Sequence, residues 1–210
     1  MGAIHPYITE DFESELIHDI EWMPIESYGY TEPKCFILNG STQDITLPSN
    51  FNNGLTSATW EFWVNCASLP TAGLIQQIYI QETSVWLALY NTGGGAFFGC
   101  DLNSGGGWFD GNGGSNTGAR TSSTLSANTW YHITYSWNGS VKIYLNGNLE
   151  STTSTGATTI LGAGTTPRSI GSRSGSYFNG KISMFRNYNA SLSAAEVLQN
   201  YNATKFRFGL

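Results

Sequence analysis

Side chains that could bind a sugar are concentrated between Asn91 and Gly118. This stretch holds 11 of the 25 glycines of the chain. Glycines let the backbone approach a ligand closely, and a tryptophan beside amide and carboxylate groups suits the apolar face and hydroxyl rim of a sugar ring. We therefore predict a glycan site here, with the candidate residues Asp101, Asn103, Trp108, Phe109, Asp110 and Asn112. The alternative is a long loop whose Trp108 and Phe109 cover one edge of the fold.

Three of these side chains could also bind a metal ion. Asp101, Asp110 and Asn112 carry the hard oxygen ligands that calcium prefers. Their spacing matches no calcium-loop pattern residue by residue. We therefore expect no cofactor and keep calcium at this loop as the alternative.

Catalytic groups are poorly represented in the rest of the chain. A retaining glycanase needs two carboxyl groups about 5 Å apart. The acids after residue 35 are all at least seven positions from one another, and they are Asp44, Glu61, Glu82, Asp101, Asp110, Glu150 and Glu196. The histidines also lack metal-ligand spacing, and they are His5, His18 and His132. We expect no enzyme activity; the alternative is two lone carboxylates that converge from distant strands.

The composition favours strands as the elements that position these residues. Charged residues make up 11% of the 210 positions and aromatic residues 14%. Aromatic residues suit pleated, half-buried strands, and a single all-β domain of this length is ordinary. The formal net charge of −6, with scattered Lys and Arg, opposes binding to nucleic acid.

Two segments show strand patterns. Apolar and polar residues alternate from Ala58 to Cys66, which predicts a half-buried strand with one outward tryptophan, Trp63. The segment from Val85 to Tyr90 is apolar on both faces, which suits the middle of a sandwich.

A hairpin is predicted around Gly139. A two-residue Asn-Gly turn would place the apolar rows of its two strands on opposite faces. A loop of residues 138–140 pairs Trp137 with Val141 and keeps both rows on one face. We predict this three-residue loop, with Gly139 or Ser140 near the left-handed conformation.

A short helix is indicated near the C-terminal end. Ser193 and Glu196 have the spacing of a capping box, and Leu192 and Val197 that of a hydrophobic staple.

The first 34 residues differ from the rest in charge. Eight acids precede residue 35 against one base, Lys34. Apolar residues recur every fourth position from residue 8 to residue 20, which predicts an acidic amphipathic helix over Thr9–Glu21 that Pro24 ends. Two arrangements are open: an arm folded back on its own domain, or an arm that docks on a partner through Phe12, Leu16, Ile20 and Trp22.

The three cysteines are odd in number and widely spaced. Cys35, Cys66 and Cys100 each lie among apolar or small residues, which favours buried free thiols over disulfides.

No basic region followed by an apolar core opens the chain, and no apolar run reaches 18 residues. We therefore expect neither a secretion signal nor a membrane span.

Several segments, in order, resemble laminin G-like domains of the concanavalin A-like lectin and glucanase superfamily. They are Phe36–Leu47 (FILNGSTQDITL), Thr59–Val64 (TWEFWV), Thr129–Gly147 (TWYHITYSWNGSVKIYLNG), Ser169–Gly171, Phe178–Arg186 (FNGKISMFR) and Leu192–Tyr201 (LSAAEVLQNY). The resemblance implies an antiparallel jelly-roll β-sandwich over residues 35–210 with a short C-terminal helix, preceded by the acidic arm of residues 1–34.

The segment from Leu192 through the tail YNATKFRFGL further resembles laminin G-like modules of tailed-bacteriophage structural proteins. That resemblance implies a virion surface protein, either a capsid decoration protein or a fibre or whisker module. Its partners would be capsid or tail proteins in a multicopy assembly or homo-oligomer, together with cell-surface glycans. The alternative is a stand-alone carbohydrate-binding lectin domain.

Overall fold

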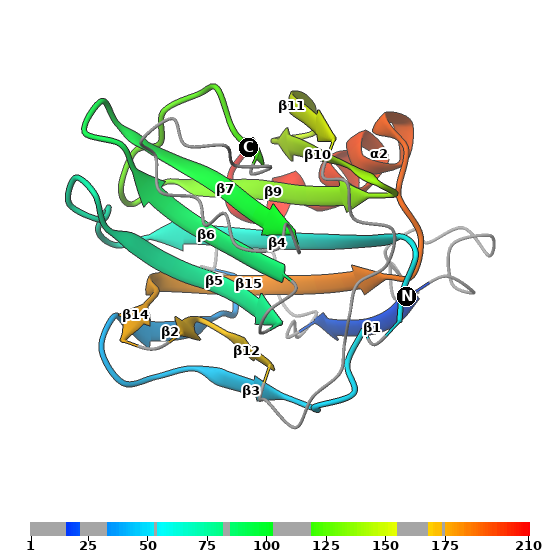
Figure 1. Cartoon of the computed structure of the whole chain (residues 1–210). Helices are drawn as coiled ribbons and strands as arrows, with labels where there is room; N and C mark the ends of the chain where they lie inside the picture. Colours follow the sequence, from blue (N-terminus) through cyan, green and yellow to red (C-terminus); the bar gives the residue numbers. More distant parts are fainter. Residues whose placement is uncertain are drawn as a thin grey trace, which may run out of the picture.

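The chain forms two antiparallel β-sheets that pack face to face (Figure 1). The structure is a computed structural model that describes residues 16–21, 33–52, 54–81, 85–102, 119–154, 168–173 and 175–210. A helix, α2 (Ala194–Thr204), and a 3-10 turn, η1 (Lys205–Phe208), follow the last strand and lie against the larger sheet. The described residues therefore have the predicted all-β sandwich and short C-terminal helix.

The larger sheet has seven strands. In spatial order, six of them are β1 (Leu16–Glu21), β15 (Asn179–Tyr188), β4 (Ala58–Cys66), β9 (Trp130–Trp137), β10 (Ser140–Leu145) and β11 (Asn148–Ser154). The seventh, β2 (Phe36–Asn39), pairs with residues 179–182 of β15, whereas β1 pairs with residues 184–188. Both strands thus lie along the edge of β15 that faces away from β4.

The smaller sheet has six strands. In spatial order they are β3 (Ile45–Leu47), β12 (Arg168–Ile170), β5 (Ile75–Gln81), β6 (Val85–Asn91), β7 (Ala96–Leu102) and β8 (Ala119–Arg120). Two further short strands, β13 (Ser172–Arg173) and β14 (Ser176–Tyr177), pair with each other and contact β5. As predicted, β6 lies in the interior of its sheet, between β5 and β7.

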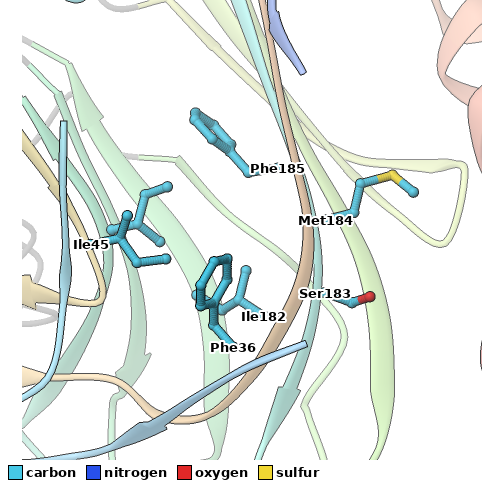
Figure 2. Close-up of a pocket in the computed structure, with 7 residues that line it drawn as sticks. Phe36, Ile45, Ile182, Ser183, Met184 and Phe185 are labelled. Carbon is cyan, nitrogen blue, oxygen red and sulfur yellow. The ribbon is translucent and has the colours of Figure 1, made fainter. Parts of the chain in front are cut away.

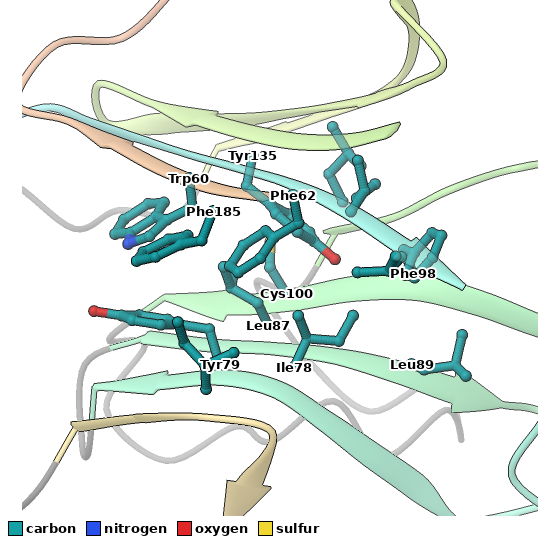
Figure 3. Close-up of a cluster of buried hydrophobic side chains, with 14 of the residues drawn as sticks. Trp60, Phe62, Ile78, Tyr79, Leu87, Leu89, Phe98, Cys100, Tyr135 and Phe185 are labelled. Atoms are coloured by element: carbon teal, nitrogen blue, oxygen red, sulfur yellow. The ribbon is translucent and has the colours of Figure 1, made fainter. Parts of the chain in front are cut away.

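Large apolar side chains from both sheets fill the space between them (Figure 3). Trp60 and Phe62 of β4 and Tyr135 of β9 face Leu87 and Phe98 of the smaller sheet, and all five are fully buried. Because side chains alternate across a strand, these residues also define which face of each sheet points outward.

The outer face of β4 is covered as well, so the prediction of a half-buried strand is wrong. Trp63 does point away from the sandwich core, but its side chain is fully buried. Its indole stacks on Phe208 with ring centres 3.9 Å apart, and its Nε1 donates a hydrogen bond of 3.0 Å to the Thr204 hydroxyl. The C-terminal segment therefore supplies the apolar cover that the alternating pattern of β4 does not reveal.

The predicted β9–β10 hairpin is confirmed. Trp137 pairs with Val141 across a loop of residues 138–140, and Gly139 has a φ of 93°. Both apolar rows thereby face the core, where Ile133, Tyr135 and Ile143 are fully buried.

The predicted start of the C-terminal helix is also confirmed. The Ser193 hydroxyl accepts from the Glu196 N–H, and the Glu196 carboxylate accepts from the Ser193 N–H, which is a capping box. Leu192 and Val197 pack in one buried cluster with Tyr144 and Tyr188, as the predicted hydrophobic staple requires.

The predicted helix over Thr9–Glu21 is wrong where the structure describes the segment. Leu16–Glu21 is β1, an antiparallel strand on β15, with Leu16 opposite Tyr188 and Ile20 opposite Phe185. Local periodicity favoured a helix, but the open edge of β15 supplies backbone partners that an isolated helix lacks. This part of the arm thus lies on the chain's own sandwich.

All three cysteines have free thiols, as predicted. Cys66 and Cys100 are buried, and Cys35 is half-buried. Burial raises the pKa of both buried thiols to about 12, which disfavours the reactive thiolate.

A small void lies between the sheets near β2 and β3 (Figure 2). Its volume is about 10 Å³, and its lining includes Phe36, Ile45, Ile182 and Phe185. A void of this size is at the limit for holding one water molecule, and a water molecule would need polar partners that an apolar lining does not supply. It is therefore a packing defect and not a binding site.

Candidate ligand-binding face

The outer face of the smaller sheet carries the strongest candidate site among the described residues. Register places Trp86 opposite Asp101, Ala88 opposite Gly99, and Tyr90 opposite Phe97. Residues opposite each other in an antiparallel pair share a face. The intervening residues, such as Leu87 and Phe98, belong to the core, so these three pairs point away from it.

Two guanidinium groups lie over aromatic rings of this face. Arg173 of β13 has its Cζ 3.3 Å from the ring centre of Trp86. Arg120 of β8 has its Cζ 4.5 Å from the ring centre of Phe97. Cation–π contacts of this kind hold a guanidinium parallel to the ring and orient its N–H donors.

The centre of the face is lined by small residues. Ala88 and Gly99 project at most a methyl group, and Arg120 is opposite Gly99 on the next strand. Ala88 and Trp86 are half-buried and Arg120 is exposed, whereas Tyr90, Phe97, Gly99 and Asp101 are buried. Among these residues, Trp86, Ala88 and Arg120 therefore supply the surface that a ligand could contact.

The structure describes one of the six residues predicted for glycan binding. Asp101 lies on β7 in the row of Trp86, with 8% of its surface exposed. The alternative of one long loop is wrong for Ala96–Leu102, which forms β7. Asn103, Trp108, Phe109, Asp110 and Asn112 lie outside the described residues.

Of the four arm residues predicted to dock on a partner, Leu16 and Ile20 lie in β1, while Phe12 and Trp22 fall outside the described residues.

Sequence reasoning did not single out Trp86, Arg120 or Arg173. Each of these three residues lies in a different short strand. They form a recognisable group only once the strands are paired.

A second polar cluster is enclosed between the larger sheet and α2. Glu61 Oε1 lies 3.1 Å from Arg186 Nη1 and 3.3 Å from His132 Nε2, and Glu61 Oε2 accepts a hydrogen bond of 2.8 Å from Asn200 Nδ2. Burial alone raises the pKa of the Glu61 carboxyl, but the interactions with His132, Arg186 and Asn200 outweigh it and lower the pKa to about 2.

This cluster is closed to ligands because Glu61 and His132 are fully buried. His132 is a residue of strand β9. The Glu61–Asn200 bond joins β4 to α2, so the cluster fixes the helix on the sheet.

No group of three or more His, Cys, Asp or Glu side chains among the described residues could hold a metal ion. Calcium at Asp101, Asp110 and Asn112 stays a prediction, because Asp110 and Asn112 lie outside those residues. No described helix is both long and apolar enough to cross a membrane.

Two antiparallel sheets, a covered larger sheet and an aromatic outer face on the smaller sheet define a lectin-like β-sandwich. Residues 39–198 match the family model Laminin_G_3, described as the concanavalin A-like lectin/glucanases superfamily. The chain therefore belongs to this family, which confirms the laminin G-like resemblance. No curated protein sequence matches the chain.

Several solved structures share the fold. Domain 4 of AbnA, a GH43 extracellular arabinanase from Geobacillus stearothermophilus in complex with arabinotriose, is 21% identical, with 78% of this chain and 74% of that chain covered and a TM-score of 0.59. The CBM40 of the Ruminococcus gnavus IT-sialidase, bound to alpha2,3 sialyllactose, is 15% identical, with 82% and 98% covered and a TM-score of 0.60.

A putative carbohydrate binding protein from Bacteroides ovatus is 18% identical, with a TM-score of 0.59; 80% of this chain and 47% of that chain are covered. At these identities the likeness establishes the fold. Two of these three structures hold a bound saccharide, and the third is described as a putative carbohydrate binding protein.

Proposed function

We propose that this domain binds carbohydrate through the outer face of the smaller sheet and does not catalyse a reaction. The observation that carries the proposal is that the partly exposed Trp86 and Ala88 and the exposed Arg120 share this face. A partly exposed tryptophan offers an apolar surface to a sugar ring, and a guanidinium group can donate hydrogen bonds to its hydroxyls.

The similar structures support the carbohydrate-binding reading better than the virion reading. Three of them are named for, or solved with, a bound saccharide or a carbohydrate-binding role. A non-catalytic role agrees with the face itself, where Asp101 is the one carboxylate among the described residues of the three pairs. Glycoside hydrolysis requires two.

A single shallow site of this kind would bind weakly. Millimolar affinity corresponds to about −4 kcal/mol, and several linked copies can raise avidity by roughly 10² to 10⁴. A multicopy assembly or homo-oligomer would therefore suit the function, and we propose it as the working form.

The proposal is tested by adding a bulky side chain to the partly exposed region of the face. Ala88→Tyr places a bulky ring at the centre of the face without removing a core side chain. We expect it to abolish binding on a glycan array while the unfolding midpoint stays close to that of the wild type. Asn202→Tyr, on the exposed side of α2, is the matched control and should bind normally. Unchanged binding by Ala88→Tyr would move the site elsewhere, with Trp108→Ala as the next variant.

The virion reading remains a second proposal. In it, the acidic segment anchors the sandwich to a capsid or tail protein on the virion surface. The eight acids before residue 35 against Lys34 support it. Because β1 completes the sheet edge, the informative variant removes residues 1–15 and keeps Leu16–Glu21. Loss of virion attachment with an intact sandwich would support anchoring, and retained attachment would contradict it.

A further inference from the structure

The loop of the β9–β10 hairpin contains an asparagine that is followed directly by a glycine, Asn138 and Gly139. We propose that Asn138 is a site of chemical modification, at which the folded chain deamidates to aspartate and isoaspartate without an enzyme. The hairpin belongs to the larger sheet, whereas the candidate ligand-binding face belongs to the smaller one. The inference is therefore independent of the proposed function.

Deamidation at an Asn-Gly pair needs water and no other reactant. The backbone nitrogen of the glycine loses its proton to solvent and attacks the side-chain carbonyl carbon of the asparagine. A C–N bond forms, and the side-chain nitrogen leaves as ammonia. Water then opens the succinimide ring at one of its two carbonyl groups, which gives aspartate or isoaspartate. Glycine favours ring closure because it has no Cβ to obstruct the approach of its nitrogen.

The chain contains six Asn-Gly pairs, and the structure describes both residues of four of them. The asparagines of these four pairs are Asn39, Asn138, Asn146 and Asn179. For the ring to close, the asparagine side chain must rotate until its carbonyl carbon reaches the next backbone nitrogen. A side chain that is held by hydrogen bonds resists this rotation, so the surroundings of each side chain rank the four pairs.

The Asn39 side chain is held by its own turn. Its Oδ1 accepts hydrogen bonds of 3.0 Å from the N–H groups of Ser41 and Thr42. Its Nδ2 donates a further hydrogen bond of 3.0 Å to the Thr42 hydroxyl. Asn39 is exposed, so exposure alone does not make an Asn-Gly pair reactive in this fold.

The side chains of Asn146 and Asn179 are held as well. Asn146 is half-buried, and its Oδ1 accepts a hydrogen bond of 3.0 Å from the His132 N–H. Asn179 is half-buried, and its Nδ2 donates a hydrogen bond of 2.7 Å to the Ser68 hydroxyl. The glycine that follows it, Gly180, is buried in β15 and paired with both β2 and β4. Ring closure at either pair would have to break these contacts.

Asn138 differs from the other three asparagines. It is exposed, and its side-chain amide makes no hydrogen bond to any residue that the structure describes. Gly139 has a φ of 93°, in the left-handed region that glycine adopts at little cost. Rotation of the Asn138 side chain toward the next backbone nitrogen therefore breaks no side-chain hydrogen bond.

The two products have different effects on the hairpin. Either one adds a negative charge to a chain whose formal net charge is −6. Isoaspartate also adds a methylene group to the main chain of a three-residue loop. Trp137 and Val141, which pair across the loop, are fully buried, so a shift of register would expose apolar side chains. Isoaspartate at position 138 should therefore destabilise the hairpin, whereas aspartate should not.

The test is peptide mapping by mass spectrometry after incubation of the full chain in mildly alkaline buffer, which reports each Asn-Gly pair separately. We expect Asn138 to deamidate at least about tenfold faster than Asn39, Asn146 and Asn179, because one hydrogen bond of ordinary strength corresponds to about this factor. In concentrated urea the four rates should converge, because the fold no longer distinguishes the side chains. A rate at Asn138 no higher than at the other three, or a ranking that persists in urea, overturns the inference.

Two variants examine the products. Asn138→Gln should abolish the charge change at this loop, because the longer side chain closes a ring far more slowly. Asn138→Asp has the charge of the products with a normal main chain and should unfold at the wild-type temperature. The isoaspartyl form, separated by ion exchange from incubated wild type, should unfold at a lower temperature than Asn138→Asp. Equal unfolding temperatures for these two would overturn the effect assigned to isoaspartate.

Discussion

The indole of Trp63 and the ring of Phe208 stack 3.9 Å apart with an angle of 10° between their planes. One residue lies in the middle of β4, and the other is two positions before the last residue, Leu210. Trp130, at the start of β9, adds a tilted contact to Phe208 at 4.9 Å. The C-terminal turn is therefore part of the folded core and not an appendage to it.

Phe208→Ala should destabilise the domain markedly. Phe208 is 7% exposed, and truncation would leave a cavity over Trp63, for which about 3 to 5 kcal/mol is typical. Phe206→Ala is the control, because Phe206 is 65% exposed and should change stability by less than about 0.5 kcal/mol. Urea unfolding measures both. Equal midpoints for the two variants would show that the turn is not held against β4.

Glu61→Gln should destabilise the domain at neutral pH by about 3 to 5 kcal/mol, because it removes the carboxylate that faces the buried Arg186 and His132. The wild type should also lose stability on acidification. The Glu61 pKa is about 2 when folded against an ordinary 4.5, so its contribution is full above about pH 4.5 and declines toward pH 2. The variant should lack this part of the acid dependence. Parallel curves of unfolding free energy against pH for the wild type and the variant would contradict this prediction.

Two tyrosines of β9 should respond oppositely to loss of the hydroxyl. The Tyr135 hydroxyl is buried with no hydrogen-bond partner among the described residues, so Tyr135→Phe should leave stability unchanged or raise it by about 1 kcal/mol. The Tyr131 hydroxyl accepts a 2.9 Å hydrogen bond from the Ser126 N–H, so Tyr131→Phe should lower stability by about 1 kcal/mol. Thermal unfolding of the two variants side by side tests the pair, and a reversed order would contradict it.

Ser193→Ala should weaken the start of α2. The substitution removes the oxygen that accepts from the Glu196 N–H, which typically costs about 0.5 to 2 kcal/mol. Ser193→Asp keeps an acceptor and should retain most of the stability. Amide exchange of residues 194–197 would show faster exchange in the alanine variant alone. Equal exchange in both variants would exclude a capping role.

The sequence was sufficient wherever a structure depends on neighbours along the chain. The apolar rows around Asn138–Ser140 favoured pairing of Trp137 with Val141, because a one-residue shift would turn one row to solvent. The capping box needed only Ser193 and Glu196, which are three residues apart.

Tertiary structure decided everything that depends on strands meeting across the fold. Leu16–Glu21 has helical periodicity, yet pairing with β15 makes it a strand. Trp63 looks exposed by alternation, yet Thr204 and Phe208 cover it.

The candidate face has the same origin. Its two guanidinium groups are 53 positions apart as Arg120 and Arg173 in the sequence, and only the pairing of β5 to β8 and the contact of β13 with β5 bring them to one face. Local patterns report which side chains a segment can bury, because burial within a strand or helix repeats at a short period. They do not report which segment lies opposite, because that choice depends on the packing of the whole chain.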